Sequence, residues 1–282
     1  GQQLCDSLRR GGYEGRLVLV GDEPVLPYQR PPLSKKFLTG ALEAERLLLR
    51  PASFYEKANV DLRLARRVTG IDRAARTLTL NDGEVLAWSG LALTTGTRIR
   101  PLSVPGAAEA DVHYVRSLAD GEALKARLAT AERLAVIGGG FIGLEVAAIA
   151  RDLGRQVVLI EAAERLMARA VAPLVSAFYA DLHRAHGVEV LLGTGIEAIR
   201  SADGRHVVVT TDGREHAVDL LRRTVDIPSA TENLTGVRRV GEIFAAELAV
   251  DQHFHADAAV ARGFRLALEV GCVLLGKLDV LL

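Results

Sequence analysis

The sequence AVIGGGFIGLEVAA, Ala135 to Ala148, and the downstream VVLIE that ends at Glu161 decide the fold. An apolar strand runs into three spaced glycines, Gly138, Gly140 and Gly143. A helix-forming stretch follows, Gly154 ends it, and a second apolar strand closes on the acid. The first glycine permits a tight turn, the second lets a diphosphate approach the helix N-terminus, and the third lets helix pack on strand. The stretch therefore predicts a complete dinucleotide-binding βαβ unit.

The acid at the end of the second strand bears on cofactor choice. Glu161 lies where its carboxylate would accept the 2′-hydroxyl of an adenosine ribose, which favours NAD over NADP. An exposed acid at a strand end is also common for no functional reason. Arg155 and Arg165 lie close by in the sequence, and either would attract a 2′-phosphate instead.

The same plan is visible in part at the start of the chain. Aligning LVLVGD, residues 17–22, on VVLIE puts Asp22 opposite Glu161 and Gly1 opposite Gly143. Gly1 is then the last glycine of a first fingerprint, Gln2 to Arg10 its helix, and Asp22 its ribose-binding acid. The strand and the two glycines that would precede Gly1 have no counterpart in this sequence.

Two such units in one chain imply two dinucleotides, most simply a flavin and a nicotinamide with hydride passing between them. The predicted fold is α/β, with two Rossmann-like dinucleotide-binding domains built on parallel sheets, the first lacking its initial strand. We expect residues 1–105 and 223–282 to form the flavin domain and residues 106–222 the NAD domain. After Leu221 the periodicity is too weak to place any element.

Composition excludes several classes of function. The chain has 282 residues, 49% of them hydrophobic, and its 35 basic residues balance 35 acidic ones. Net charge therefore gives no reason to expect a nucleic acid or a membrane surface as partner. Cys5 and Cys272 are too few for a disulfide framework, which fits a reducing, cytoplasmic location. We expect no signal peptide, no membrane span and no metal site; the histidines His253 and His255 read better as part of a solvated loop.

Further elements follow from local patterns. Residues 60–95 alternate in short segments with a hairpin turn at Asp82 and Gly83, which indicates a β-rich region. Residues 91–102 predict an apolar strand that enters a glycine turn. Residues 172–186 predict an amphipathic helix, and strands with a turn at Asp212 and Gly213 follow it. In the Pro-rich loop of residues 24–35, Ser34 is a good N-cap for a following helix.

Four segments together resemble a known family: QRPPLSKKFL, LALTTGTRIRPL, VIGGGFIGLEVAA and VSAFYADLHRAHGVEV. They look like the FAD-dependent, NADH-oxidising ferredoxin reductases of oxygenase systems, flavoproteins of the pyridine nucleotide-disulfide oxidoreductase superfamily. The resemblance covers roughly residues 1–222. It implies an electron-transfer oxidoreductase in which NADH gives hydride to FAD, and single electrons then pass to a ferredoxin or rubredoxin.

The resemblance also assigns site residues. It implies that Lys35 lies beside the flavin ring and pairs with Glu145, which points towards the place where nicotinamide meets flavin; these two are the candidate catalytic residues. The implied flavin contacts are Gly1, Asp22, Arg30, Lys35, Val68 and Arg116. The implied NAD contacts are Gly138, Gly140, Gly143 and Glu161. From the sequence alone, Glu145 is equally explained by the preference of helix N-termini for carboxylates.

Disulfide reductases share the two-dinucleotide fold but need closely spaced cysteines, and this sequence has no such pair, which disfavours that class. One alternative stays open: a nucleotide-binding remnant, or a protein resembling apoptosis-inducing factor, without efficient electron transfer. The sequence also departs from the family in lacking the later Ala-x-Gly-Asp motif, whose aspartate binds flavin.

Overall fold

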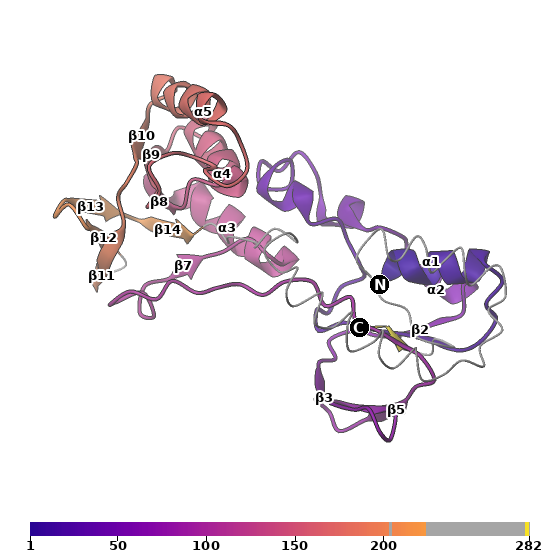
Figure 1. Cartoon of the computed structure of the whole chain (residues 1–282). Helices are drawn as coiled ribbons and strands as arrows, with labels where there is room; N and C mark the ends of the chain where they lie inside the picture. The colour runs from indigo at the N-terminus through magenta and orange to yellow at the C-terminus, as the bar shows by residue number, and fades with distance from the viewer. Residues whose placement is uncertain (203–204, 224–279, 282) are drawn as a thin grey trace. The chain divides into compact units, whose positions relative to one another are not determined.

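The computed structural model describes residues 1–202, 205–223 and 280–281, which divide into two compact units (Figure 1). Of the described residues, unit 1 contains 1–28, 48–97 and 280–281, and unit 2 contains 29–47, 98–202 and 205–223. The first domain was also predicted to include residues 224–279, which lie outside the described residues. His253 and His255 lie outside them too. Within the described part of the chain, no helix has the length and apolar character that a membrane crossing requires.

Unit 1 is built on a parallel sheet with strand order β2-β1-β15-β6. Every residue of β1 is buried, as expected of a strand inside a parallel sheet. A Cβ on Gly1 would lie 2.8 Å from Leu19 Cδ1, so a glycine here lets α1 approach β1 closely. The elements are α1 (Gln2–Arg10), β1 (Leu17–Val20), α2 (Ala52–Lys57), β2 (Val60–Arg63), β6 (Leu91–Ala92) and β15 (Val280–Leu281).

An antiparallel sheet completes unit 1 and confirms the β-rich region. It joins β3 (Val68–Asp72), β4 (Thr77–Leu80) and β5 (Val85–Ala87). The predicted hairpin turn is present, with Gly83 at a φ of 89°, a value that glycine adopts without strain. The apolar strand predicted at the start of residues 91–102 is present but short, Leu91–Ala92, and Gly96 has a positive φ of 67° in the predicted glycine turn.

Unit 2 contains the predicted βαβ unit, and the prediction is confirmed. Strand β8 leads through the glycine turn into α4, and β9 returns parallel to β8. The full sheet is parallel, with order β10-β9-β8-β14-β7. The predicted helix of residues 172–186 is α5. The elements are β7 (Val112–His113), β8 (Arg133–Ile137), α4 (Phe141–Asp152), β9 (Gln156–Ile160), α5 (Pro173–Ala185), β10 (Val188–Leu191) and β14 (Leu220–Arg223).

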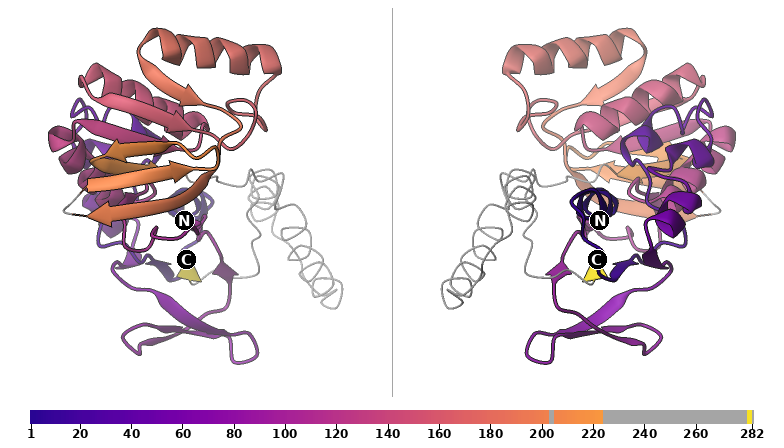
Figure 2. Two further views of the ribbon diagram at one scale, coloured as in Figure 1. Left: turned by 90° about the vertical axis from the view of Figure 1, so that its left-hand side faces the viewer. Right: turned by 90° about the vertical axis from the view of Figure 1, so that its right-hand side faces the viewer.

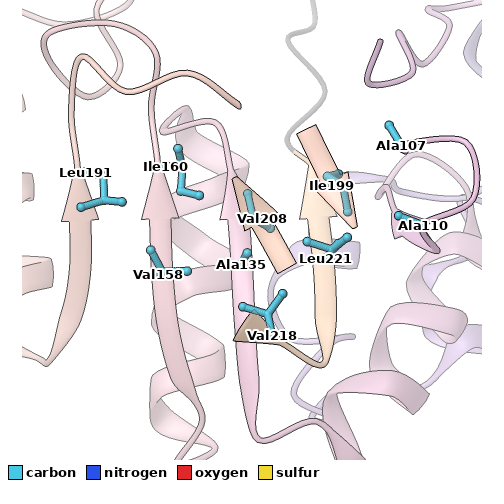
Figure 3. Packing of buried hydrophobic residues seen from close by; sticks show 10 residues of the cluster. All are labelled: Ala107, Ala110, Ala135, Val158, Ile160, Leu191, Ile199, Val208, Val218 and Leu221. Carbon is cyan, nitrogen blue, oxygen red and sulfur yellow. The ribbon is translucent and has the colours of Figure 1, made fainter. Parts of the chain in front are cut away.

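Three antiparallel strands cover one face of this sheet: β11 (Ile196–Ala202), β12 (Arg205–Thr210) and β13 (Glu215–Val218) (Figure 2). Their apolar side chains pack on those of β8, β9, β10 and β14 in one buried cluster (Figure 3). Val208 and Val218 from the antiparallel sheet meet Ala135, Val158 and Leu221 from the parallel one. This cluster packs against β8, the strand whose carboxyl end leads into the glycine turn.

One short element of unit 2 differs from the prediction. The Pro-rich loop forms a 3-10 turn, η1 (Pro31–Ser34), which ends at Ser34, so the expectation that Ser34 caps a following helix was wrong. The two prolines fix φ at the start of the turn, and Leu33 buries itself beneath it. The other elements are η2 (Ala44–Leu47) and α3 (Leu118–Thr130), which begins with a capping box between Ser117 and Asp120.

Buried histidines make the stability of unit 2 sensitive to acid. Burial lowers the pKa of His183 and of His206 below their ordinary value, so both are neutral in the folded chain at neutral pH. On acidification the unfolded chain takes up these protons first, so the free energy of unfolding should fall as pH drops below about 6.5. Urea titrations at pH 7.5, 6.5 and 5.5 measure this, and the fall should be smaller in His206→Gln. A pH-independent urea midpoint would contradict the expectation.

Candidate functional site

The turn between β8 and α4 is shaped to receive an anion. Gly138 has a φ of 101° and its amide donates to the Ile160 carbonyl at 2.8 Å, which ties the turn to the neighbouring strand. Gly140 is the N-cap of α4, and as a glycine it has no side chain of its own to cap that helix end. The first amides of a helix point along its axis and carry partial positive charge, so an uncapped end suits a phosphate.

Gly139, the middle glycine of the run, is closely packed, although the spacing rule does not single it out. A Cβ on Gly139 would lie 2.5 Å from Leu166 Cδ2 and 3.2 Å from Glu161 Oε2. Its amide donates to Glu161 Oε2 at 2.6 Å, and its carbonyl accepts from the Met167 amide at 3.0 Å. The GGG run was the signal that could have identified it.

Glu161 therefore has a structural task at the turn. Its second oxygen, Oε1, accepts from the Ala163 amide at 2.8 Å, so both oxygens bind backbone amides beside the fingerprint. The nearby arginines point elsewhere: Arg165 donates to Ser176 Oγ and two backbone carbonyls, and Arg155 donates to the Ala129 carbonyl. These contacts oppose the reading in which Arg155 or Arg165 receives a 2′-phosphate.

The predicted contact between Lys35 and Glu145 is present. Lys35 Nζ lies 2.9 Å from Glu145 Oε1, with the lysine side chain 52% exposed and the glutamate side chain 27% exposed. Lys35 follows η1, and Glu145 is the fifth residue of α4, beyond the first turn where a helix N-terminus favours carboxylates. The helix dipole thus explains Glu145 less well than the ion pair does.

Ser34 joins this pair, although sequence reasoning missed it. Its hydroxyl donates to Glu145 Oε2 at 2.6 Å, and the residue is buried. Glu145 also lines a pocket of about 510 Å³ between α4 and α5, whose other lining residues include Phe141, Tyr179 and His183. The carboxylate is therefore held by two neighbouring residues of one loop while it borders a concave surface.

Arg30 and Arg116, two further candidate site residues in unit 2, contact each other. Arg30 donates to the Arg116 carbonyl at 2.5 Å, which ties the η1 loop to the segment before α3. The Arg116 amide in turn donates to Asp120 Oδ2 at 3.0 Å, within the capping box. The structure thus brings Arg30 and Arg116 together, through a backbone group that no sequence pattern indicates.

In unit 1, Asp22 contacts Arg67, the residue immediately before Val68. Asp22 follows β1, and its carboxylate lies 3.0 Å from Arg67, the residue immediately before β3 and Val68. The Asp22 side chain is about half exposed. Arg67 is a further candidate that sequence reasoning missed. Gly1, at the start of α1, completes the set placed in unit 1.

Unit 2 also contains a buried charged residue, Arg222, which was not among the predicted site residues. The Arg222 side chain on β14 is fully buried, and none of its guanidinium nitrogens has a hydrogen-bond partner among the described residues. Burial lowers its pKa to about 10, and the field of Glu145 acts in the opposite direction. Because successive side chains alternate along a strand, Arg222 faces away from the cluster that contains Leu221.

The fold consists of two Rossmann-like units, and one of them contains the complete strand, glycine turn and helix of a dinucleotide-binding motif. Comparison with known sequences agrees: the family described as pyridine nucleotide-disulphide oxidoreductase matches residues 1–240. Rhodocoxin reductase of Rhodococcus erythropolis is 44% identical over 212 residues, which are 75% of this chain and 50% of that protein. Putidaredoxin reductase of Pseudomonas putida is 40% identical over 227 residues, 78% of this chain and 54% of that protein.

Solved structures give the same result. The ferredoxin reductase for the CYP199A2 system from Rhodopseudomonas palustris superposes with a TM-score of 0.77 at 39% identity, over 82% of this chain and 57% of that one. The chain belongs to the pyridine nucleotide-disulphide oxidoreductase family. It spans about half the length of the curated relatives it matches.

Proposed function

We propose that this chain carries the two nucleotide sites of an NADH-dependent ferredoxin reductase, an electron-transfer flavoprotein. The observation that carries the proposal is the ion pair between Lys35, which follows η1, and Glu145, which lies on the helix after the glycine turn. Relatives at 40–44% identity are named as reductases of rhodocoxin and putidaredoxin, which supports the choice of reaction. Residues 1–105 and 223–282 would serve FAD, and residues 106–222 would serve NADH.

The residues present fit both cofactors. In unit 2 the glycine turn leads directly into the start of α4, whose N-cap is Gly140, and the helix amides at such an end suit the diphosphate of NADH. In unit 1 the close approach of α1 to β1 at Gly1, with Asp22 at the end of that strand, suits the adenosine half of FAD. Val68, Arg30 and Arg116 would complete the flavin contacts.

Bound FAD would supply the chemistry by accepting two electrons from NADH and releasing them singly. The protein's own task is then placement and electrostatics. Lys35 would present an ammonium to the flavin ring, and Glu145 would hold that ammonium in place while it borders the pocket between α4 and α5. Neither residue has to transfer a proton for this role.

Selectivity for NADH follows from Glu161. Its carboxylate would accept the ribose 2′-hydroxyl and repel a 2′-phosphate, while its bonds to the Gly139 and Ala163 amides fix its position. Arg155 and Arg165 make hydrogen bonds with other groups, so the negative charge of Glu161 would dominate at the ribose.

Replacing Glu161 with glutamine should weaken this selectivity. The amide oxygen still accepts one backbone hydrogen bond, but the charge that repels a 2′-phosphate is gone. We expect the ratio of NADPH to NADH dissociation constants to fall about tenfold, or about 1.4 kcal/mol. Quenching of intrinsic fluorescence measures both constants. Glu164→Gln, an exposed acid three residues on, is the matched control and should leave the ratio unchanged; equal ratios in all three proteins would refute the role of Glu161.

The electron acceptor would be a ferredoxin or rubredoxin. The chain has two cysteines, Cys5 and Cys272, far apart in the sequence, so it lacks the dithiol that a disulfide reductase uses. Burial raises the pKa of the Cys5 thiol to about 11, which makes it a poor nucleophile. We place the protein in the cytoplasm, where unpaired cysteines stay reduced.

A coupled assay tests the proposed function. Purified chain loaded with FAD is mixed with NADH and cytochrome c, and a ferredoxin is then added. Cytochrome c reduction that rises sharply only on addition of ferredoxin supports the reductase. Protein that binds NADH without ever reducing ferredoxin would contradict it and favour a nucleotide-binding protein without electron transfer.

A further inference from the structure

The carboxylate of Glu145 receives two donors from consecutive residues of one turn. Ser34 Oγ lies 2.6 Å from Oε2, and Lys35 Nζ lies 2.9 Å from Oε1. An ionised carboxylate only accepts hydrogen bonds, and each of its oxygens here has a separate donor. The serine and the lysine together therefore fix the plane of the carboxylate as well as its position.

The two donors differ in rigidity. Lys35 is a long side chain that is half exposed, and an exposed ion pair by itself is weak because water and salt compete for both charges. Ser34 is 5% exposed and turns about a single side-chain bond, so it loses little freedom when it donates. The serine is thus the donor that water displaces least.

The backbone under Ser34 is also fixed. Pro31 and Pro32 set φ in the 3-10 turn, and the Lys35 amide donates to the Pro32 carbonyl at 3.0 Å. Leu33 packs beside Gly121 of α3, where a Cβ would lie 3.4 Å from Leu33 Cδ2. The hydroxyl is thereby aimed at α4 by elements that do not depend on Glu145.

From this geometry we infer that Ser34 is a positioning residue that orients the Glu145 carboxylate for its ion pair with Lys35. The orientation itself is a property of the chain. Its consequence for hydride transfer rests on the proposed function, because there Lys35 must be held against the flavin. Removing the hydroxyl should loosen the ion pair without disturbing the glycine turn that would hold NADH.

The first test measures the ion pair without any cofactor. Acetylation by an activated acetate ester needs a free amine, so it reports how firmly Lys35 is held, and mass spectrometry compares it with the adjacent, exposed Lys36. Ser34→Ala should raise Lys35 acetylation about fivefold, the equivalent of one ordinary hydrogen bond, and leave Lys36 unchanged. Ser34→Cys keeps the size of the side chain and should give a similar increase.

A double substitution separates positioning from general loosening. Glu145→Ala should raise Lys35 acetylation more than Ser34→Ala does, and adding Ser34→Ala to it should produce no further rise. Unchanged acetylation in both Ser34 variants, or additive effects of the Ser34 and Glu145 substitutions, would overturn the inference.

The second test addresses catalysis in the FAD-loaded chain. Ser34→Ala should lower the limiting rate of flavin reduction about tenfold, as expected when reacting groups lose alignment, with the half-saturating NADH concentration unchanged. Faster acetylation with an unchanged limiting rate would overturn the catalytic consequence. Failure of NADH to reduce the unsubstituted protein would instead refute the proposed function, and the acetylation result would stand apart from it.

Discussion

Replacing Arg222 with methionine should raise the free energy of unfolding by about 1–4 kcal/mol, the range seen when buried ionic groups give way to apolar ones. The guanidinium is fully buried on β14, and its three nitrogens have no hydrogen-bond partner among the described residues. Burial lowers its pKa to about 10 despite the opposing field of Glu145, so the folded chain bears a desolvation cost that methionine, of similar length, avoids.

Urea unfolding at pH 7 measures the effect as a higher midpoint with an unchanged slope. Arg223→Met is the matched control, because Arg223 is the next residue of the same strand and is only partly buried. The control should shift the midpoint little. A midpoint for Arg222→Met at or below that of the unsubstituted chain would show that the buried charge stabilises the fold.

The second large effect is expected at the glycine turn. Gly139→Val should weaken NADH binding roughly 10–100-fold, because the new side chain must displace Leu166 and the Glu161 carboxylate that the turn relies on. Quenching of fluorescence by NADH measures the dissociation constant. A circular dichroism melt on the same sample checks that unit 2 still folds.

Gly154→Asn provides the control for this substitution. Gly154 ends the same βαβ helix, a side chain there meets open space, and asparagine tolerates its φ of 77°. Its NADH affinity should match that of the unsubstituted chain. Equal NADH affinity in Gly139→Val would mean that the dinucleotide does not lie at this turn.

The βαβ unit could be predicted because its determinants are local. Three glycines, two apolar strands and a terminal acid fall within one short stretch, and the structure has strand, helix and strand there. The hairpin turns at residues 82–83 and 212–213 were likewise readable, since each needs a particular turn residue. The start of helix α3 is equally local, because Ser117 and Asp120 form a capping box within four residues.

What could not be predicted depends on tertiary contacts. Ser34 reads as a helix cap in sequence, yet its hydroxyl bonds a carboxylate 111 residues away. Arg222 lies just beyond Leu221, where the periodicity of the sequence is too weak to place an element, whereas the fold places β14 between β8 and β7 and buries Arg222. Periodicity cannot show that a short strand is central in its sheet.

The candidate site could be predicted from the sequence only in part. The Lys35–Glu145 pair was predicted only through the family resemblance, and the structure has it at 2.9 Å. The contacts of Glu161 with backbone amides were not predictable, because strand-end acids do not show in sequence which way they point.

The most direct measurement is an anaerobic titration of the FAD-loaded chain with NADH, followed by flavin absorbance. The account predicts that one equivalent of NADH bleaches the flavin band, and that NADPH at the same concentration does so far more slowly. A flavin band that persists while fluorescence shows NADH bound to the chain would contradict the claim that the two sites exchange electrons.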